Sequence, residues 1–89
     1  MPLVIVRHKV RDTVAWRARF DADAPARAAA GLTGVTTYRD TGDESTVVVL
    51  IPVPDLAMAR AFMASEPLRQ SMEKAGVIGE PEVRYLEEI

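Results

Sequence analysis

The sequence has 89 residues with 11 basic and 13 acidic side chains, a net charge of −2, one histidine and no cysteine. This length predicts a single domain, residues 1–89, and the scattered, nearly balanced charges exclude a domain that binds nucleic acid through a concentrated basic surface. The lack of cysteine excludes disulfides and thiol catalysis, and the apolar run at residues 3–6 is too short for a signal peptide or a membrane span, so we expect a cytoplasmic protein without a membrane partner.

The first predicted elements are a strand and a helix. Residues 3–10 alternate in hydropathy and predict a β-strand. One face of this strand would carry Val4, Val6, His8 and Val10. Asp12 is a favourable N-cap for a helix that begins at Thr13. Trp16 and Phe20 lie one turn apart in that helix and therefore share a face.

The same helix is expected to carry two charge pairs at i,i+4 spacing on its solvent side. These pairs are Arg17 with Asp21 and Arg19 with Asp23. Pro25 disfavours helix at the residue before it and starts a second short helical piece, which Gly31 ends. The first helical region is therefore expected in two parts.

Two strands joined by a hairpin loop are expected in the middle of the chain. Residues 34–40 are rich in β-branched and aromatic side chains, residues 41–45 form the loop, and residues 46–53 form the third strand. The third strand is apolar almost throughout, which predicts that both of its faces are covered.

The C-terminal part predicts two more helices and a last strand. Residues 55–65 are apolar nearly all round, so this helix is expected to be largely buried. Ser65 is expected to cap a helix over residues 66–75 that stops at Gly76. Its inner stripe is Leu68 and Met72. Residues 82–89 alternate and predict the final strand.

The order of these elements is β-α-β-β-α-β, with the second α split in two. This is the ferredoxin-like split βαβ pattern of the α+β class, a four-stranded antiparallel sheet with helices on one face only. The other face is apolar, and a small chain gains by covering such a face with a second copy of itself. We therefore expect a homodimer in which the two sheets form an α+β barrel.

The segment 31–69 carries a family resemblance. It has a glycine before the second strand, Tyr38 and Arg39 along that strand, an acidic hairpin and an apolar third strand. A helix then ends in a turn containing Ala64, Ser65 and Pro67. In these features the chain resembles the antibiotic biosynthesis monooxygenase-like proteins of the dimeric α+β-barrel superfamily. The opening residues also look like small members labelled cyclase-like. The resemblance implies a dimeric barrel that works on small molecules without a cofactor.

One position departs from the family pattern. The monooxygenase-like members commonly have a histidine in the helix just before that turn, and alignment on the turn places Phe62 there. A cofactor-free oxygenase needs a group that deprotonates a phenolic substrate and stabilises the anion. With phenylalanine at this position, the resemblance implies proton transfer or ring closure rather than oxygenation or haem degradation.

His8 is the remaining candidate for acid–base chemistry. Its neighbours on the strand face are valines, so burial is expected to lower its pKa and keep the imidazole neutral at pH 7. A neutral imidazole in an apolar cavity can accept a proton from an enolisable or phenolic ligand. The alternative is a structural histidine whose ring is satisfied by one backbone or side-chain partner.

Other side chains are assigned supporting roles. Tyr38 is a candidate hydrogen-bond donor to a developing oxyanion, or a strand tyrosine with its hydroxyl at the rim. Arg84 would hold a ligand carboxylate or form an interface ion pair. An apolar substrate-binding lining, which equally suits plain core, is predicted from Trp16, Phe20, Met58, Phe62, Met63 and Met72. A single histidine and no cysteine give no metal cluster, and no cofactor is expected.

The resulting hypothesis is a cofactor-independent, cyclase-like or monooxygenase-like enzyme that acts by acid–base proton transfer or ring closure on a flat apolar compound of polyketide type. The alternative is a non-catalytic ligand-binding protein or a structural dimer. A cavity of roughly 300 Å³ or more that reaches His8 would favour a ligand site, and a filled core would favour the alternative.

Overall fold

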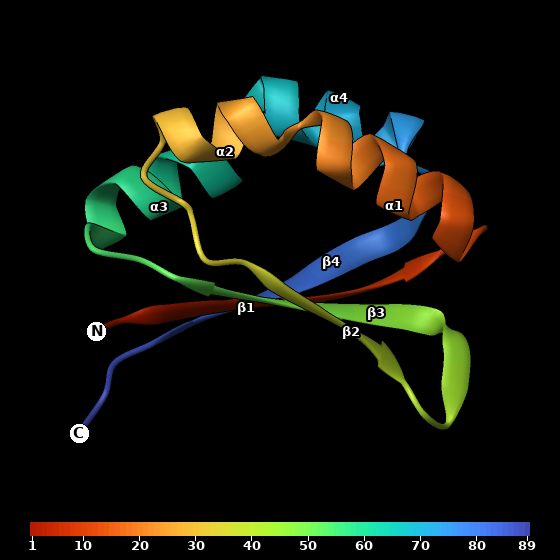
Figure 1. Cartoon of the computed structure of the whole chain (residues 1–89), viewed down its shortest axis with the longest axis horizontal. Coiled ribbons are helices and arrows are strands. Elements are labelled where there is room, and N and C mark those ends of the chain that lie inside the picture. Colours follow the sequence, from red (N-terminus) through yellow and green to blue (C-terminus); the bar gives the residue numbers. More distant parts are fainter.

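A four-stranded antiparallel sheet with four helices on one of its faces forms the fold in the computed structural model, which describes residues 1–89 (Figure 1). The elements in chain order are β1 (Leu3–Val10), α1 (Thr13–Ala22), α2 (Ala24–Ala29), β2 (Thr36–Asp40), β3 (Asp43–Pro52), α3 (Leu56–Met63), α4 (Glu66–Lys74) and β4 (Val77–Leu86). The strand order is β2-β3-β1-β4. This arrangement confirms the predicted ferredoxin-like α+β fold, with both helical regions divided into two.

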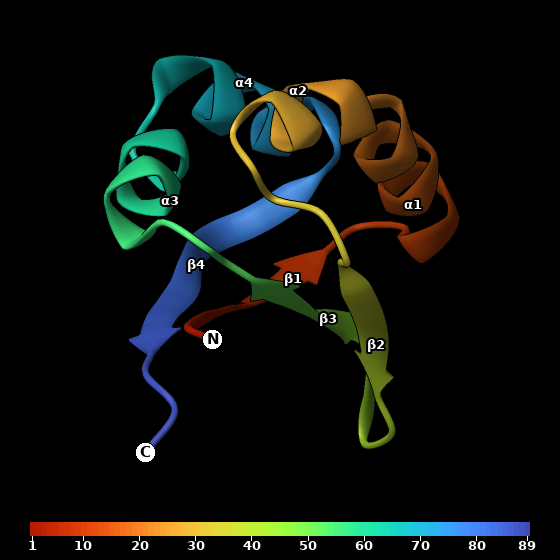
Figure 2. The same ribbon diagram turned by 60° about the vertical axis from the view of Figure 1, so that its left-hand side comes forward.

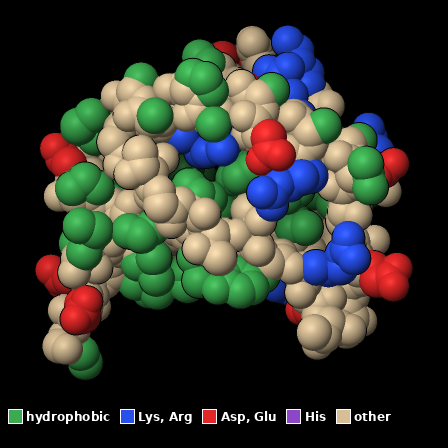
Figure 3. Space-filling view, in the orientation of Figure 1, with side chains coloured by type: hydrophobic (Ala, Val, Ile, Leu, Met, Phe, Trp, Pro, Cys, Tyr) green, Lys and Arg blue, Asp and Glu red, His purple; other side chains and the backbone are tan.

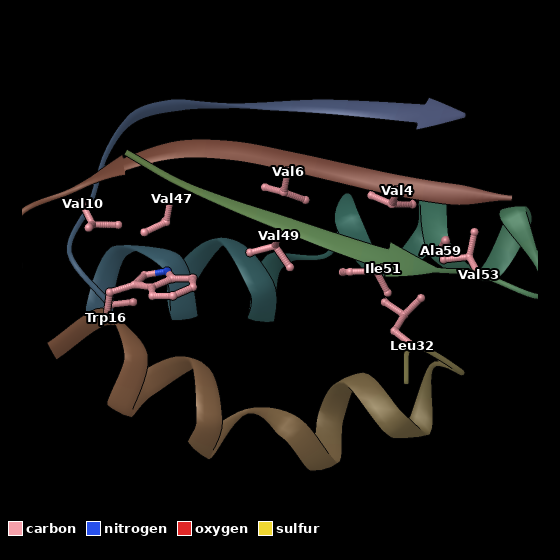
Figure 4. Close-up of a cluster of buried hydrophobic side chains, with 11 residues drawn as sticks. Val4, Val6, Val10, Trp16, Leu32, Val47, Val49, Ile51, Val53 and Ala59 are labelled. Carbon is pink, nitrogen blue, oxygen red and sulfur yellow. The ribbon is translucent and has the colours of Figure 1, made fainter. Parts of the chain in front are cut away.

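Strand β1 lies between β3 and β4 and supplies the centre of the core. Its residues alternate between buried and more exposed positions, as the sequence predicts, and Val4, Val6, His8 and Val10 are the buried ones. Directly paired residues of antiparallel strands share a face, so Val47 and Val49 on β3 join them. Figure 4 shows these valines directed from the sheet toward the helices, with Trp16 rising from α1 to meet them.

The helices begin where the capping residues predict. The Asp12 side chain accepts hydrogen bonds from the backbone N–H of Val14 at 2.8 Å and of Ala15 at 3.2 Å. Ser65 accepts from the N–H of Leu68 at 3.4 Å. These bonds satisfy amide groups that lack partners within the helix, and they fix which side chains of α1 and α4 face the sheet. None of the four helices has the length and apolar character needed to cross a membrane.

Strand β4 differs from its predicted bounds. Expected over residues 82–89, it runs from Val77 to Leu86. Gly79, at φ 73°, and Pro81 disfavour a regular strand, and the pairing with β1 shifts there from Arg7↔Glu82 to Lys9↔Ile78. The irregularity accommodates both residues on an edge strand, where such bulges are tolerated.

The predicted burial of the third strand and third helix is also corrected. On β3, Val47 and Val49 are buried, whereas Val48 on the other face is half-buried, because no helix covers that face in the single chain. Of helix α3, only Ala59 is buried, and Met58 is 46% exposed. Figure 2 shows α3 at the margin of the helical layer, where only one side of the helix packs against other elements.

Strands β2 and β3 also differ slightly from their expected bounds. Strand β2 begins at Thr36 rather than at residue 34, and β3 begins at Asp43 rather than at residue 46. The hairpin loop therefore shortens to residues 41–42. Asp40 tightens this turn by accepting from the Gly42 N–H at 2.7 Å.

Burial predicts the cost of shortening individual valines. Val53 is 0% exposed, so Val53→Ala should lower the free energy of unfolding by about 2 kcal/mol through lost apolar burial and a residual cavity. Val14 is 77% exposed, and Val14→Ala should change the free energy of unfolding by less than about 0.5 kcal/mol. Urea denaturation at one protein concentration measures both, and equal effects would contradict the assignment of the core.

Candidate functional site

A cavity of about 230 Å³ lies between the sheet and the helical layer. Eleven of its 17 lining residues are hydrophobic, and they come from β1, β3 and all four helices. Figure 3 shows a hollow at this level in which hydrophobic side chains are visible, with basic and acidic side chains at its rim. The site is therefore an apolar chamber with a small number of polar groups.

His8 is the polar side chain that β1 contributes to this cavity. It is 6% exposed, and neither Nδ1 nor Nε2 has a hydrogen-bond partner. Burial lowers the pKa of the imidazole from 6.5 to about 4, because the charged form loses its hydration, so the ring is neutral at pH 7. The expected lowering of the pKa is confirmed, and the alternative of a histidine satisfied by a protein partner is not what the structure shows.

The strand pairing explains why space remains beside His8. On the β3 side His8 pairs with Val47, a small neighbour. On the β4 side every residue from Leu3 to Val10 has a partner except His8, because the register shifts between Arg7 and Lys9. The interruption of the ladder therefore falls at the one histidine. β-Bulges are frequent beside active sites, where they redirect a side chain.

One wall of the cavity is a series of stacked groups. The ring centroids of His8 and Trp16 are 5.6 Å apart, with the planes tilted by 56°. Trp16 and Phe20 are stacked at 4.9 Å and 23°. The guanidinium carbon of Arg27 lies 3.7 Å from the centroid of Phe20. All four side chains line the cavity, so the stack extends from the imidazole at the sheet to a cation on α2.

A polar cluster joins α1 to α4 at the same cavity. Arg19 Nε lies 3.3 Å from Asp23 Oδ2 and donates to Ser71 Oγ at 3.2 Å, and the Ser71 hydroxyl donates to Asp23. The pair of Arg19 and Asp23 was expected on the solvent side but is half-buried, because Ser71 lies beside it. Ser71 is three residues beyond Leu68 on the inner stripe of α4, and that spacing was the signal that could have identified it.

Five of the predicted lining residues do surround the cavity with His8. They are Trp16, Phe20, Phe62, Met63 and Met72. Arg27 also lines the cavity but lies in an alanine-rich segment where no periodic pattern in the sequence marks it.

Three predicted site residues lie elsewhere. Tyr38 pairs with Val48, which puts it on the face of the sheet without helices, and it is 53% exposed. Arg84 pairs with Ile5 on that same face and lies 3.4 Å from Glu82. Met58 is exposed on α3. The structure therefore does not bring Tyr38, Arg84 or Met58 to His8. For the two strand residues the reason is that side chains alternate between the faces of a sheet.

A second, more open groove of about 320 Å³ lies between α1 and β2 and includes Tyr38. Both of its arginines already have hydrogen-bond partners. Arg17 donates to Thr37, and Arg39 donates to Thr13 at 3.1 Å. Across the chain no three His, Asp or Glu side chains converge as they would to hold a metal ion. The first cavity is therefore the one with buried polar atoms that have no partner.

Solved structures with this fold were found over the whole chain. SnoaB, a cofactor-independent oxygenase from Streptomyces nogalater, is 15% identical with a TM-score of 0.78, over 99% of this chain and 92% of that one. A Bordetella bronchiseptica protein assigned to the antibiotic biosynthesis monooxygenases is 14% identical with a TM-score of 0.83, over 99% and 96%. A conserved protein from Methanosarcina mazei Go1 is 10% identical with a TM-score of 0.77, over 99% and 92%.

These similarities confirm that the chain has the fold of the antibiotic biosynthesis monooxygenase-like proteins. Neither protein-family models nor curated proteins gave a match. At 10–15% identity the structural comparisons establish the fold alone.

The lowered pKa of His8 predicts a pH-dependent stability. Between pH 6.5 and about 4 the unfolded chain binds a proton at His8 that the folded chain excludes, so the free energy of unfolding should fall as the pH falls through this window. The loss should reach about 2–3 kcal/mol at the acid end of the window. Urea denaturation from pH 7.5 to 4.5 measures it.

His8→Leu should remove this component and should raise the stability at pH 7, because the buried imidazole nitrogens have no partners to lose and their desolvation cost disappears. Acidic groups such as Asp43 titrate in both proteins, so the difference between the two curves isolates His8. If the free energy of unfolding depends on pH in the same way in wild type and His8→Leu, the pKa of His8 is not lowered by folding.

Proposed function

We propose that the chain is a cofactor-independent small-molecule enzyme in which His8 exchanges a proton with a flat apolar substrate in the cavity. The observation that carries this proposal is the buried imidazole whose two nitrogens face no protein partner. A polar group of this kind costs free energy unless something bonds to it, and a ligand oxygen or an acidic C–H group in the cavity would do so.

The proposed step begins with the unprotonated ring nitrogen of His8. Its lone pair takes a proton from a carbon next to a carbonyl, or from a phenol, and the released electron pair forms an enolate or phenolate. The imidazolium then lies beside the anion that it has generated, and this ion pair raises the pKa of His8 above its value in the empty cavity. In a ring closure the enolate carbon attacks a second carbonyl, and the imidazolium returns the proton to the new alkoxide.

The place of Phe62 favours proton transfer over oxygenation. Phe62 lines the cavity on α3, at the position where the resembling monooxygenases commonly have a histidine. SnoaB carries out its chemistry without a cofactor, which supports a cofactor-free reaction in this fold. Here the imidazole is that of His8 on β1. We therefore propose that the sheet supplies the base and that α3 contributes only an apolar wall to the cavity.

The volume of the cavity bounds the size of the substrate. At about 230 Å³ it reaches His8 but falls short of the roughly 300 Å³ expected of a typical ligand pocket, and it is larger than the roughly 150 Å³ cavity that holds benzene. One or two fused rings would fit beside the aromatic wall of Trp16 and Phe20. The proposed substrate is therefore a compact aromatic or enolisable ketone, at the small end of the polyketide-like compounds.

The alternative is a non-catalytic protein that binds a small ligand in the same cavity. One observation favours it: a pKa of about 4 makes the imidazole of the empty site a weak base at pH 7. In that case His8 only forms a hydrogen bond to a ligand oxygen. The two functions require the same binding site and differ in whether a proton moves.

We also propose that the chain acts as a homodimer whose sheets meet face to face. In the single chain the face opposite the helices is uncovered, as Figure 1 shows. It presents the apolar side chains Leu3, Ile5, Tyr38, Val48, Leu50 and Leu86. Charged side chains such as Arg7 and Arg84 share this face, so the proposed interface combines apolar and charged groups, and a second copy offers a complementary face by symmetry.

Deuterium exchange tests the proposed proton transfer. 2-Tetralone is an enolisable two-ring ketone, and in D₂O the wild-type protein should accelerate deuterium incorporation next to its carbonyl. His8→Gln should lower that acceleration by at least about a hundredfold, because glutamine hydrogen-bonds but is not a base. Proton NMR of the ketone measures the rate.

Lys9→Gln is the matched control for this experiment. Lys9 is the next residue of β1, exposed on the other face and 3.6 Å from Asp43, so its loss should leave the exchange rate unchanged. If the ketone perturbs the cavity resonances and wild type exchanges no faster than His8→Gln, the non-catalytic alternative holds.

Light scattering tests the dimer. At micromolar concentration the wild type should have about twice the 9.8 kDa mass of the chain. Leu50 lies on the uncovered face opposite Ile5, so Leu50→Glu should give a folded monomer. Val14→Glu adds the same charge at an exposed position of α1 and should remain dimeric. A wild type that stays monomeric on concentration would overturn the barrel.

A further inference from the structure

Arg27 is a buried cation without an ion pair. It is 9% exposed on the short helix α2 and lines the cavity. Its Nη1 donates to the carbonyl of Phe20 at 2.7 Å, and no other protein acceptor takes a hydrogen bond from the guanidinium. A guanidinium has five N–H donors, so most of the Arg27 donors have no protein acceptor. The guanidinium nitrogens without a protein partner are not fully buried, so they remain accessible to solvent and to a ligand anion.

The acidic residues nearby do not satisfy Arg27. Asp23 and Asp21 stabilise its charge at a distance, but neither forms an ion pair with it. The Asp23 carboxylate is engaged by Arg19 and by the Ser71 hydroxyl, and Asp21 pairs with Arg17 at 3.1 Å. Desolvation by burial lowers the pKa of Arg27 more than these carboxylates raise it. The guanidinium remains charged at pH 7, since an arginine does not lose its proton in a protein.

The position of Arg27 makes it a receptor within the cavity rather than a surface charge. One face of the guanidinium lies over Phe20, which fixes its plane. Phe20 stacks on Trp16, and Trp16 contacts His8, so the cation and the neutral imidazole are the two polar ends of one aromatic wall. A planar ligand lying along that wall would meet both ends.

We propose that Arg27 binds a carboxylate of the ligand, so that the cavity selects flat apolar acids over neutral compounds of the same shape. The guanidinium fork matches a carboxylate with two parallel hydrogen bonds, which gives both strength and orientation. The far end of the acid then lies toward His8, where an enolisable or phenolic group would meet the base. This inference rests on the proposed ligand site and names its substrate class, but it does not require that a proton be transferred.

A pair of probes with equal shape and different charge tests the preference. 2-Naphthoate and 2-naphthamide have the same ring system, and only the first carries a carboxylate. Titration of each into the ¹⁵N-labelled wild-type protein, followed by NMR at the side-chain signals of His8, Trp16 and Arg27, gives two values of Kd. Naphthoate should bind at least about tenfold more tightly, the ratio expected for a charge-assisted hydrogen bond. The Arg27 Nε–H signal should move with naphthoate and stay in place with naphthamide.

Arg27→Met should bring the two Kd values to within about twofold of each other, through a loss of naphthoate affinity. Arg60→Met is the matched control, because Arg60 also lies over an aromatic ring, at 4.2 Å from the centroid of Tyr85, but does not line the cavity. It should keep the tenfold preference. The Arg27 Nε–H shift in wild type decides the matter independently if Arg27→Met does not fold.

The outcomes separate this inference from the proposed function. Equal affinities for the two probes in wild type, with His8 and Trp16 signals shifting for both, would overturn the role of Arg27 and leave the ligand cavity standing. A preference that survives in Arg27→Met would also overturn it. Absence of binding by both probes would overturn the acid-selective site together with the proposed ligand cavity.

Discussion

The burial of an unpartnered imidazole beside small side chains is the feature on which the site depends. The helices cover one face of the sheet as two divided pairs, and the strands present mostly valines to them. Valines under a divided helical layer leave a cavity of about 230 Å³. His8 faces this cavity because the alternation of β1 puts it on the helical side of the sheet, and the β1–β4 register is interrupted at its position. Its neutral state at pH 7 follows from the same burial, since no charged partner compensates the lost hydration.

The polar groups of the cavity divide into satisfied and unsatisfied ones. Arg19, Asp23 and Ser71 bond to one another and connect α1 to α4, which stabilises the helical layer over the sheet. His8 and Arg27 keep donors or acceptors that no protein group uses. Satisfied networks serve structure, whereas buried nitrogens without partners, as in His8, and free guanidinium donors at the same cavity, as in Arg27, are available to a ligand. The apolar wall between these two groups supports a flat ligand with a polar group at each end.

Local sequence signals predicted the elements and the position of His8. Alternation over residues 3–10 assigned His8 to the buried face, and the Asp12 cap oriented Trp16 toward the core. The prediction of Tyr38 in the same cavity was wrong because its face depends on the β2–β3 register, which no local pattern states. Arg27 was missed because no periodic pattern marks it in its alanine-rich segment, and Ser71 because its hydrogen bond to Asp23 joins residues 48 positions apart. The first half of β4 was not predicted, because the bulge there contains a glycine and a proline, which are unfavourable in a regular strand.

The central claim is that His8 is a buried, unpaired imidazole open to a ligand, and an NMR titration tests it most directly. The chain has a single histidine, so its imidazole ¹⁵N signals need no assignment. In the free protein they should report a pKa of about 4, since desolvation by burial disfavours the charged ring. With saturating 2-naphthoate the pKa should rise, because the bound anion favours the imidazolium. A pKa near 6.5 that does not respond to the acid would contradict the account.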